Sequence, residues 1–189
     1  MRKSAFIYIA TLLALLAALL VGCQAQPTPA TPTPTPESQT YPNSEQGFSF
    51  KYPADWVFAE DYMGLVVFVG GPEVLEGDYT VNVSLATEQL PEEMRVEDYA
   101  KQVELNTKNS APDLNKVDEY NTTVGGQQAI VFTFTATLKV EEKEYFLKDS
   151  AAVLIKDGVG YIITYDVPIE FYDEYVDAFE LVIDSFKFQ

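Results

Sequence analysis

The stretch QQAIVFTFTATLKV, residues 127–140, decides the fold class that this 189-residue sequence predicts. It alternates apolar and polar side chains, with Ile130, Phe132 and Phe134 facing one way, which is typical of a β-strand with one buried face. A Gly-Gly pair stands just before it, and such pairs supply the positive φ angles that tight hairpins need. Residues 116–124, ahead of that pair, are therefore predicted to form a neighbouring antiparallel strand.

Two further runs continue this meander towards the C-terminus. Residues 144–156 return the chain, Asp157 and Gly158 form a turn, and residues 161–165 make the next strand. Pro168 ends that strand, because proline cannot donate a backbone hydrogen bond to a sheet. Hairpin connections of this kind indicate antiparallel pairing.

The first half of the chain adds shorter alternating runs, which we predict to be strands at residues 48–52, 56–58, 65–69 and 80–86. Pro53 follows the first of these runs, as is usual for an edge strand or a first strand. The run at 65–69 is expected to end at Gly70-Gly71-Pro72, since these residue types favour turns.

Two segments have helical instead of alternating periodicity. One helix is centred on an apolar stripe of Val96, Tyr99, Ala100 and Val103. A second is expected over about residues 170–185, with an apolar stripe of Phe171, Tyr175, Phe179 and Val182, and a short strand or tail at 186–188 closes the chain. This order of elements predicts an α+β fold, an antiparallel sheet of about seven or eight strands flanked by helices in an αβα sandwich.

The sequence GFSFKYPADW, residues 47–56, resembles the opening of PsbP-like domains. Further similarity over residues 41–189 lies in the valine-rich run at 65–69, in the Gly125-Gly126 turn, and in the closing helix with Phe179, Ile183, Ser185 and Phe186. The resemblance implies an antiparallel sheet between helices. It also implies a non-enzymatic role, because the best-known member is an extrinsic subunit of photosystem II that helps retain calcium and chloride. Similar domains occur as lipoproteins in organisms without photosynthesis.

This chain departs from the photosynthetic members in two respects. It contains no histidine that would match a metal-binding histidine of the plant proteins, and it has no basic N-terminal arm for docking to a membrane complex. The resemblance therefore implies the fold but not the photosystem role.

The N-terminal residues predict targeting to the cell envelope. Arg2 and Lys3 precede an uncharged run at residues 5–22, which is the layout of a secretory signal peptide. The sequence LVGC at 20–23 resembles a bacterial lipobox, so the only cysteine, Cys23, is predicted to be acylated and to anchor the protein on the extracytoplasmic side of a membrane. The alternative is an uncleaved signal anchor with an incidental cysteine.

A spacer is predicted between this anchor and the domain. Residues 23–40 carry the modified cysteine and the run PTPATPTPTP, which favours an extended polyproline-like chain that cannot pack a core. At about 3 Å per residue, that run would hold the domain roughly 30 Å from the membrane. One domain is expected, at residues 41–189.

Composition excludes several classes of function. Without histidine there is no Ser-His-Asp triad and no HExxH zinc site, and one cysteine cannot form an internal disulfide. The net charge of −17, which becomes −19 when Arg2 and Lys3 are removed, argues against nucleic acid as a partner. Gly158-Val159-Gly160 begins like a dinucleotide-binding motif but belongs to a predicted hairpin. We assign no catalytic residue, cofactor or metal ligand from the sequence.

Carboxylates and aromatic side chains remain as candidates. An acidic stripe on the last helix would suit a cation such as Ca²⁺, or else form a solvated face: Asp173, Asp177, Glu180 and Asp184. A loop with Asp113, Asn115, Asp118 and Glu119 lacks the glycine and the glutamate of an EF-hand. Glu141, Glu142 and Glu144 are expected to cover a hairpin end.

Five aromatic residues would either line a ligand cleft or belong to the core, which the alternation favours: Trp56, Tyr62, Tyr99, Tyr161 and Tyr165. Asn82 and Asn121 match the glycosylation sequon, a motif that is frequent by chance.

Three functional hypotheses follow. The first is a non-catalytic, membrane-anchored interaction domain that binds or stabilises an envelope protein. The second is a module that binds a small ligand or Ca²⁺. The third, a carboxylate-based hydrolase, would require two acids that face each other in a cleft, with a raised pKa on one of them.

Overall fold

The computed structural model describes residues 37–74, 80–140 and 142–189. Within these ranges no helix combines the length and the apolar character that crossing a membrane requires. The predicted signal peptide, Cys23, most of the spacer and Glu141 lie outside the described residues.

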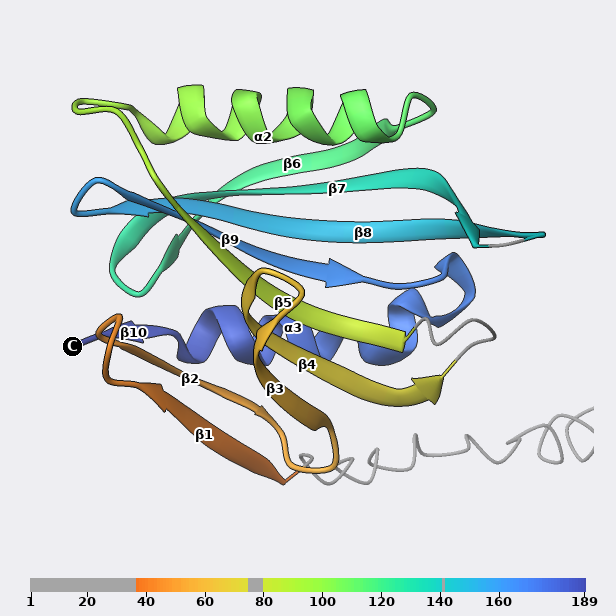
Figure 1. Cartoon of the computed structure of the whole chain (residues 1–189), viewed down its shortest axis with the longest axis horizontal. Coiled ribbons are helices and arrows are strands. Elements are labelled where there is room, and N and C mark those ends of the chain that lie inside the picture. The colour runs from red at the N-terminus through yellow and green to blue at the C-terminus, as the bar shows by residue number, and fades with distance from the viewer. Residues whose placement is uncertain (1–36, 75–79, 141) are drawn as a thin grey trace, which may run out of the picture. The chain divides into compact units, whose positions relative to one another are not determined.

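A seven-stranded antiparallel sheet forms the centre of the domain (Figure 1). Its strand order, β3-β4-β5-β9-β8-β7-β6, contains the predicted meander from β6 to β9 and joins the two halves of the chain where β5 pairs with β9. The bounds of its strands are β3 Val57–Tyr62, β4 Leu65–Val74, β5 Thr80–Gln89, β6 Asn115–Val124, β7 Gln127–Val140, β8 Lys143–Lys156 and β9 Val159–Asp166.

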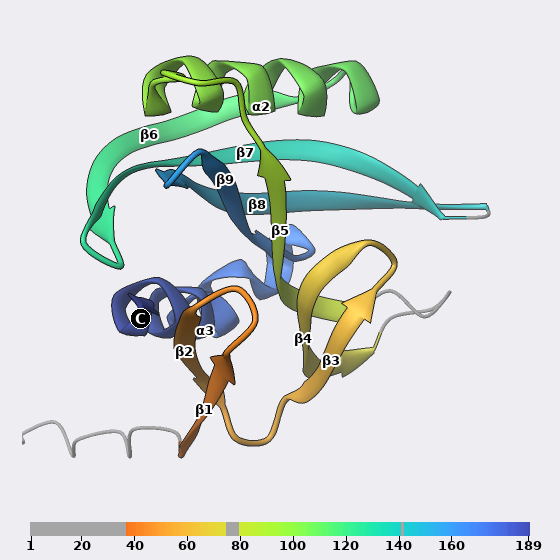
Figure 2. The ribbon, with the colours of Figure 1, turned by 60° about the vertical axis from the view of Figure 1, so that its left-hand side comes forward.

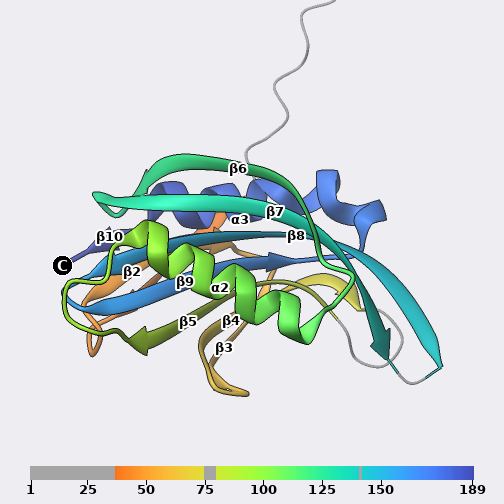
Figure 3. The ribbon, with the colours of Figure 1, turned by 90° about the horizontal axis from the view of Figure 1, so that it is seen from above.

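Each face of this sheet is covered by one helix. Helix α2, Val96–Ser110, lies across one face, as Figure 3 shows, and α3, Tyr172–Ser185, packs on the other after a short 3₁₀ turn at Ile169–Phe171. The predicted α+β fold with an antiparallel sheet between helices is therefore confirmed.

A second, three-stranded sheet packs beside α3 and was not predicted (Figure 2). Its order is β1-β2-β10, with β1 at Ser38–Asn43, β2 at Phe48–Pro53 and β10 at Lys187–Phe188. The motif residues 48–53 form its central strand. The hydroxyl of Ser185 at the end of α3 accepts a hydrogen bond from the backbone N–H of Lys51 at 2.7 Å, which ties the helix to this sheet.

Two hydrophobic clusters result from this layering. The larger lies between the two sheets around α3, where Phe48 and Phe50 stack against Phe186. The smaller lies under α2, where Tyr99, Ala100 and Val103 pack on Phe132 and other side chains of β7 and β8. Because β7 and β8 are central strands that contribute to both clusters, the two sides of the core share one scaffold.

The predicted end of one strand was wrong. Gly70-Gly71-Pro72 does not terminate β4, which continues to Val74 with an irregular register between Gly70 and Val74. Gly71 instead allows close packing, because a Cβ atom there would lie 3.2 Å from Cζ2 of the Trp56 ring. The glycine pair is therefore a packing feature of a bent strand.

Candidate functional site

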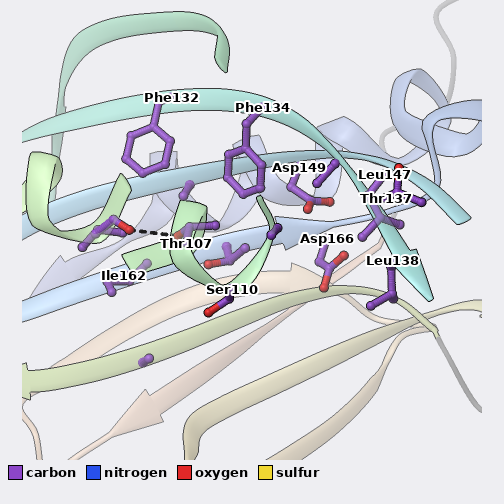
Figure 4. Close-up of a pocket in the computed structure, with 16 residues that line it drawn as sticks. Thr107, Ser110, Phe132, Phe134, Thr137, Leu138, Leu147, Asp149, Ile162 and Asp166 are labelled. Carbon is purple, nitrogen blue, oxygen red and sulfur yellow. Dashed lines mark hydrogen bonds between the residues drawn. The ribbon is translucent and has the colours of Figure 1, made fainter. Parts of the chain in front are cut away.

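A cavity of about 530 Å³ lies where the sheet extends past the C-terminal end of α2 (Figure 4). Its origin is a mismatch in length. The 15 residues of α2 span about 22 Å, whereas the 14 residues of β7 and of β8 each span about 46 Å. The helix therefore leaves part of this face of the sheet uncovered, and we call the resulting cavity the α2 pocket.

The α2 pocket is lined by side chains from α2 and from four strands. Its wall is mainly apolar, with two aspartates and four hydroxyl groups. The lining residues are Ala86, Val103, Thr107, Ser110, Ala111, Phe132, Phe134, Ala136, Thr137, Leu138, Leu147, Asp149, Ala151, Ile162, Thr164 and Asp166.

Two carboxyl groups meet at one end of this pocket. The register places Phe134 opposite Asp149 and Ser150 opposite Tyr165, so that Asp149 and Asp166 face each other across the next position of β8 and β9. Their side chains are close enough to hydrogen-bond to each other. Asp149 is only 6% exposed, and its Oδ1 accepts a hydrogen bond from the backbone N–H of Val167 at 3.0 Å.

The environment of this pair changes its protonation. Burial raises the pKa of Asp149 well above its ordinary value, the charge of Asp166 raises the pKa further, and the Val167 N–H opposes both effects. Two carboxylates in contact cannot both ionise easily in an apolar setting. The pair therefore holds a shared proton at neutral pH and carries about one negative charge.

A second cavity, of about 430 Å³, adjoins this end of the domain. It shares Ala136, Thr137 and Leu147 with the α2 pocket. Two of its lining residues are large apolar side chains that remain exposed, Phe146 at 64% and Ile169 at 48%. We call these two residues the apolar rim.

Among the residues that the structure describes, the acids that the sequence singled out are not gathered into a metal-binding group. Asp173, Asp177, Glu180 and Asp184 are all exposed on α3, as expected for a solvated face. The predicted loop was wrong, because Asn115, Asp118 and Glu119 lie on β6, and Asp113, just before this strand, accepts a hydrogen bond from the Thr137 backbone N–H. Across the described ranges, there is no group of three or more side chains that could hold a metal ion.

The acidic residues of β6 and of the β7–β8 hairpin end have ordinary structural roles. Glu119 forms an ion pair with Lys116 at 2.7 Å. Glu144 pairs with Lys139 at 2.6 Å near the exposed end of the β7–β8 hairpin. Glu142 is exposed at the same hairpin end. These contacts support solvated surface roles for the acids.

The suggestion of an aromatic cleft was wrong, and the core alternative holds. Trp56, Tyr99, Tyr161 and Tyr165 are all buried, whereas Tyr62 is 47% exposed and lies against Phe68 with the two rings tilted by 44°.

Of the two sequons, Asn121 lies exposed on β6. Asn82 is buried, and its amide Nδ2 donates to the carbonyl of Thr80, which leaves no room for a glycan on the folded domain.

Asp149 and Asp166 were missed from the sequence, although a signal for Asp149 was present. Leu147, Ala151 and Val153 occupy alternate positions on the inward face of β8, and Asp149 interrupts this apolar series. A carboxyl group on the buried face of a strand needs a partner or a function.

Comparison with known families confirms the resemblance noted in the sequence. A family model described as PsbP-like protein matches residues 30–188, a range that includes every described strand and helix. No curated protein sequence matches the chain.

Solved structures of similar fold come from several organisms. PsbP of the cyanobacterium Synechocystis sp. PCC 6803 has a TM-score of 0.59 and 16% identity, covering 89% of this chain and 100% of that one. LpqN, which is involved in cell envelope biogenesis of Mycobacterium tuberculosis, has a TM-score of 0.58 and 13% identity, covering 79% and 90%. The Ran-binding protein Mog1p of Saccharomyces cerevisiae has a TM-score of 0.57 and 8% identity, covering 82% and 96%. At these identities the likeness shows a shared fold.

Proposed function

This chain belongs to the PsbP-like protein family, and we propose that it is a non-catalytic binding domain, anchored to a membrane on its extracytoplasmic side through lipid on Cys23. The observation that carries the binding role is the α2 pocket, an apolar-lined cavity with a small number of convergent polar groups. Its volume is within the range of small-molecule sites, about 300–1,000 Å³. Of the hypotheses drawn from the sequence, the geometry therefore favours a small-ligand module.

The spacing of the carboxyl pair differs from that of a glycosidase. Glycosidases hold their two carboxyl groups about 5–9.5 Å apart, so that a substrate or a water fits between them. Asp149 and Asp166 are instead close enough to hydrogen-bond to each other, and Asp149 is almost fully buried. The pair meets the requirement stated for a carboxylate hydrolase, two facing acids in a cleft with a raised pKa on one of them, but not the spacing of a glycosidase. The non-catalytic role therefore rests on the family, whose members are generally accessory proteins.

The membrane anchor is tested by replacing Cys23. We expect the native protein to sediment with membranes and to carry an acylated Cys23 at its mature N-terminus, as measured by mass spectrometry of protein from its own cells. Cys23→Ala should abolish acylation. Most of the protein should then no longer be present in the processed form that the lipid anchors to the membrane.

Asp177→Asn is the matched control for that experiment, because it alters an exposed residue of α3 and should leave processing unchanged. Membrane protein that retains Met1 would contradict the lipid anchor and support an uncleaved signal anchor.

A second candidate function is binding to an envelope protein, and the apolar rim is the observation that favours it. Phe146 and Ile169 are large, exposed and adjacent to one cavity, and exposed apolar groups of this kind often mark contact sites. A photo-crosslinking residue at either position should capture the same envelope protein in intact cells. The control position is Leu105, which is similarly exposed, at 59%, on α2.

This second function predicts a crosslinked product that is shared by positions 146 and 169 and absent from position 105. The same spread of abundant proteins from all three positions would contradict a specific partner at the rim.

A further inference from the structure

We propose that the ligand of the α2 pocket is a small organic amine, with an apolar or aromatic body in the cavity and a protonated amino group on the Asp149–Asp166 pair. This inference rests on the proposed function and adds to it the chemical class of the ligand. Four features of the pocket carry it: the hydrogen-bonding capacity of its wall, its charge, the adjacent helix terminus, and the shape and chemistry of its apolar surface.

The polar groups of the wall are mainly hydrogen-bond acceptors. The hydroxyl of Thr107 already donates to the carbonyl of Val103 at 2.9 Å, and that of Ser110 donates to the carbonyl of Asn106 at 3.3 Å. Each hydroxyl has one hydrogen, so these two oxygens can offer only lone pairs to a ligand. The carboxyl pair, with one proton between its members, adds further acceptor sites. Apart from the hydroxyls of Thr137 and Thr164, which can also donate, the wall therefore requires a ligand that donates hydrogen bonds.

The charge of the wall likewise favours a ligand that donates hydrogen bonds, and in particular a cation. Its sixteen lining residues include two aspartates and neither lysine nor arginine. The nearest basic side chain in the sequence of β8, Lys148, lies on the opposite face of the sheet, where its Nζ stands 3.6 Å from the centre of the Tyr172 ring. An ammonium group would supply the missing positive charge and form charge-assisted hydrogen bonds, which are about twice as strong as neutral ones.

The end of α2 adds to this preference. Thr107, Ser110 and Ala111 belong to the last turn and the C-cap of the helix, and all three line the pocket. The C-terminal end of a helix carries a partial negative charge, which favours a cation nearby. Two sources of negative potential thus converge on one cavity: the Asp149–Asp166 pair, with about one negative charge, and the helix terminus.

The remaining wall fits an apolar body. Phe132 and Phe134 stand side by side with ring centroids 6.0 Å apart, and Leu138, Leu147 and Ile162 complete the surface shown in Figure 4. Phe134 is the cross-strand neighbour of Asp149, so that a cation held by the carboxyl pair lies near an aromatic ring. Such a position adds a cation–π attraction to the ion pair.

The test compares three probes that share one aromatic body and differ in their polar group: 2-phenylethylamine, 2-phenylethanol and phenylacetate. The full chain is reconstituted in nanodiscs of zwitterionic lipid, and titration heats are corrected with empty nanodiscs. We expect saturable binding of the amine at pH 7, with the alcohol and the carboxylate at least about tenfold weaker, because only the amine donates charge-assisted hydrogen bonds.

Variants locate the binding site. Asp166→Asn should weaken amine binding at least about tenfold and leave the alcohol unchanged, since it keeps the size of the side chain and removes the negative charge of the pair, whereas Asp149→Asn leaves that charge in place and should weaken amine binding less. Asp177→Asn removes the same unit of charge from the exposed face of α3 and should leave all three affinities unchanged. Circular dichroism of each variant checks that it is folded.

Different negative results have different consequences. Equal binding of amine and alcohol, unaffected by either aspartate variant, would overturn the amine assignment and leave a pocket for a neutral ligand. Failure of all three probes to bind the folded protein would count against the pocket itself and thus against the proposed small-ligand function.

Discussion

Replacing Gly160 by alanine is expected to destabilise the domain by about 3 kcal/mol, and replacement by valine by more, because both overpack a closed core. A Cβ atom at Gly160 would lie 2.5 Å from Cζ and from the hydroxyl oxygen of Tyr99, and 2.7 Å from its Cε1. Tyr99 has no room to move, since it is fully buried on the face of α2 that packs on the sheet and its hydroxyl donates a hydrogen bond to Glu88 at 3.0 Å. Urea unfolding of each variant measures the decrease in the free energy of unfolding.

A double-mutant cycle separates this clash from other effects. In a Tyr99→Leu background, the shorter side chain leaves space above the strand. Gly160→Ala should therefore lower the free energy of unfolding by less than it does when Tyr99 is present. Gly158→Ala serves as a matched control in the same hairpin. Its Cβ would meet nothing within 4 Å, and its φ of +78° predicts a cost of about 1 kcal/mol from backbone strain alone. A cost of Gly160→Ala no larger than that of the control would contradict the packing role.

Gly160 illustrates how much of the fold the sequence could predict. The alternation and the Asp157-Gly158 turn were enough to assign Gly158-Val159-Gly160 to a hairpin, and β8 and β9 have that connection. The contact of Gly160 with Tyr99 could not be predicted, because it depends on where α2 docks on the sheet. Local periodicity thus predicted the elements, whereas their packing required tertiary structure.

The three-stranded sheet was missed for a related reason. Strand β1 is largely polar and exposed, with only Tyr41 buried, so that it has no periodic signal. Strand β10 has only two residues, and it pairs with β2 across most of the length of the chain. Neither strand has the local pattern that would distinguish it from a linker or a tail.

The carboxyl pair was closer to being predictable. A two-residue turn at Asp157-Gly158 pairs Lys156 with Val159, and counting back along both strands places Asp149 opposite Asp166. The predicted hairpin was therefore enough to place Asp149 opposite Asp166. The cavity around it did not follow from the sequence, because it arises from the shorter reach of α2 over the long strands.

Replacing Asp149 by asparagine is expected to stabilise the domain increasingly as the pH rises, by about 2–4 kcal/mol more at pH 8 than at pH 5. The pKa of Asp149 is raised in the folded protein by burial and by Asp166, so the native state keeps a proton that the unfolded chain releases. Stability therefore falls as the pH rises between the ordinary pKa of an aspartate and the raised one, by up to about 1.4 kcal/mol per pH unit. Asparagine removes this dependence.

The geometry of the site allows that substitution. The amide oxygen of asparagine can still accept the hydrogen bond from the Val167 N–H, and its amide hydrogens can donate to Asp166. Asp98 and Asp113 have lowered pKa values, which favour folding above their titration range and produce the opposite dependence at acidic pH. Both residues are present in the native protein and in the variant, so their effects cancel in the difference. Asp177→Asn is the control, and its stability curve should run parallel to that of the native protein.

This prediction and the binding experiment together distinguish a functional acid from a structural one. If the carboxyl pair only held the strands together, replacing either acid would destabilise the domain, whereas Asp149→Asn is expected to stabilise it and Asp166→Asn to weaken binding of the amine. A pair of acids that costs stability at neutral pH and is needed for binding has the properties of a ligand-recognition site. Stability profiles of native and Asp149→Asn protein that run parallel from pH 5 to pH 8 would show that the pair does not retain its proton, and would contradict the shared-proton state of the site.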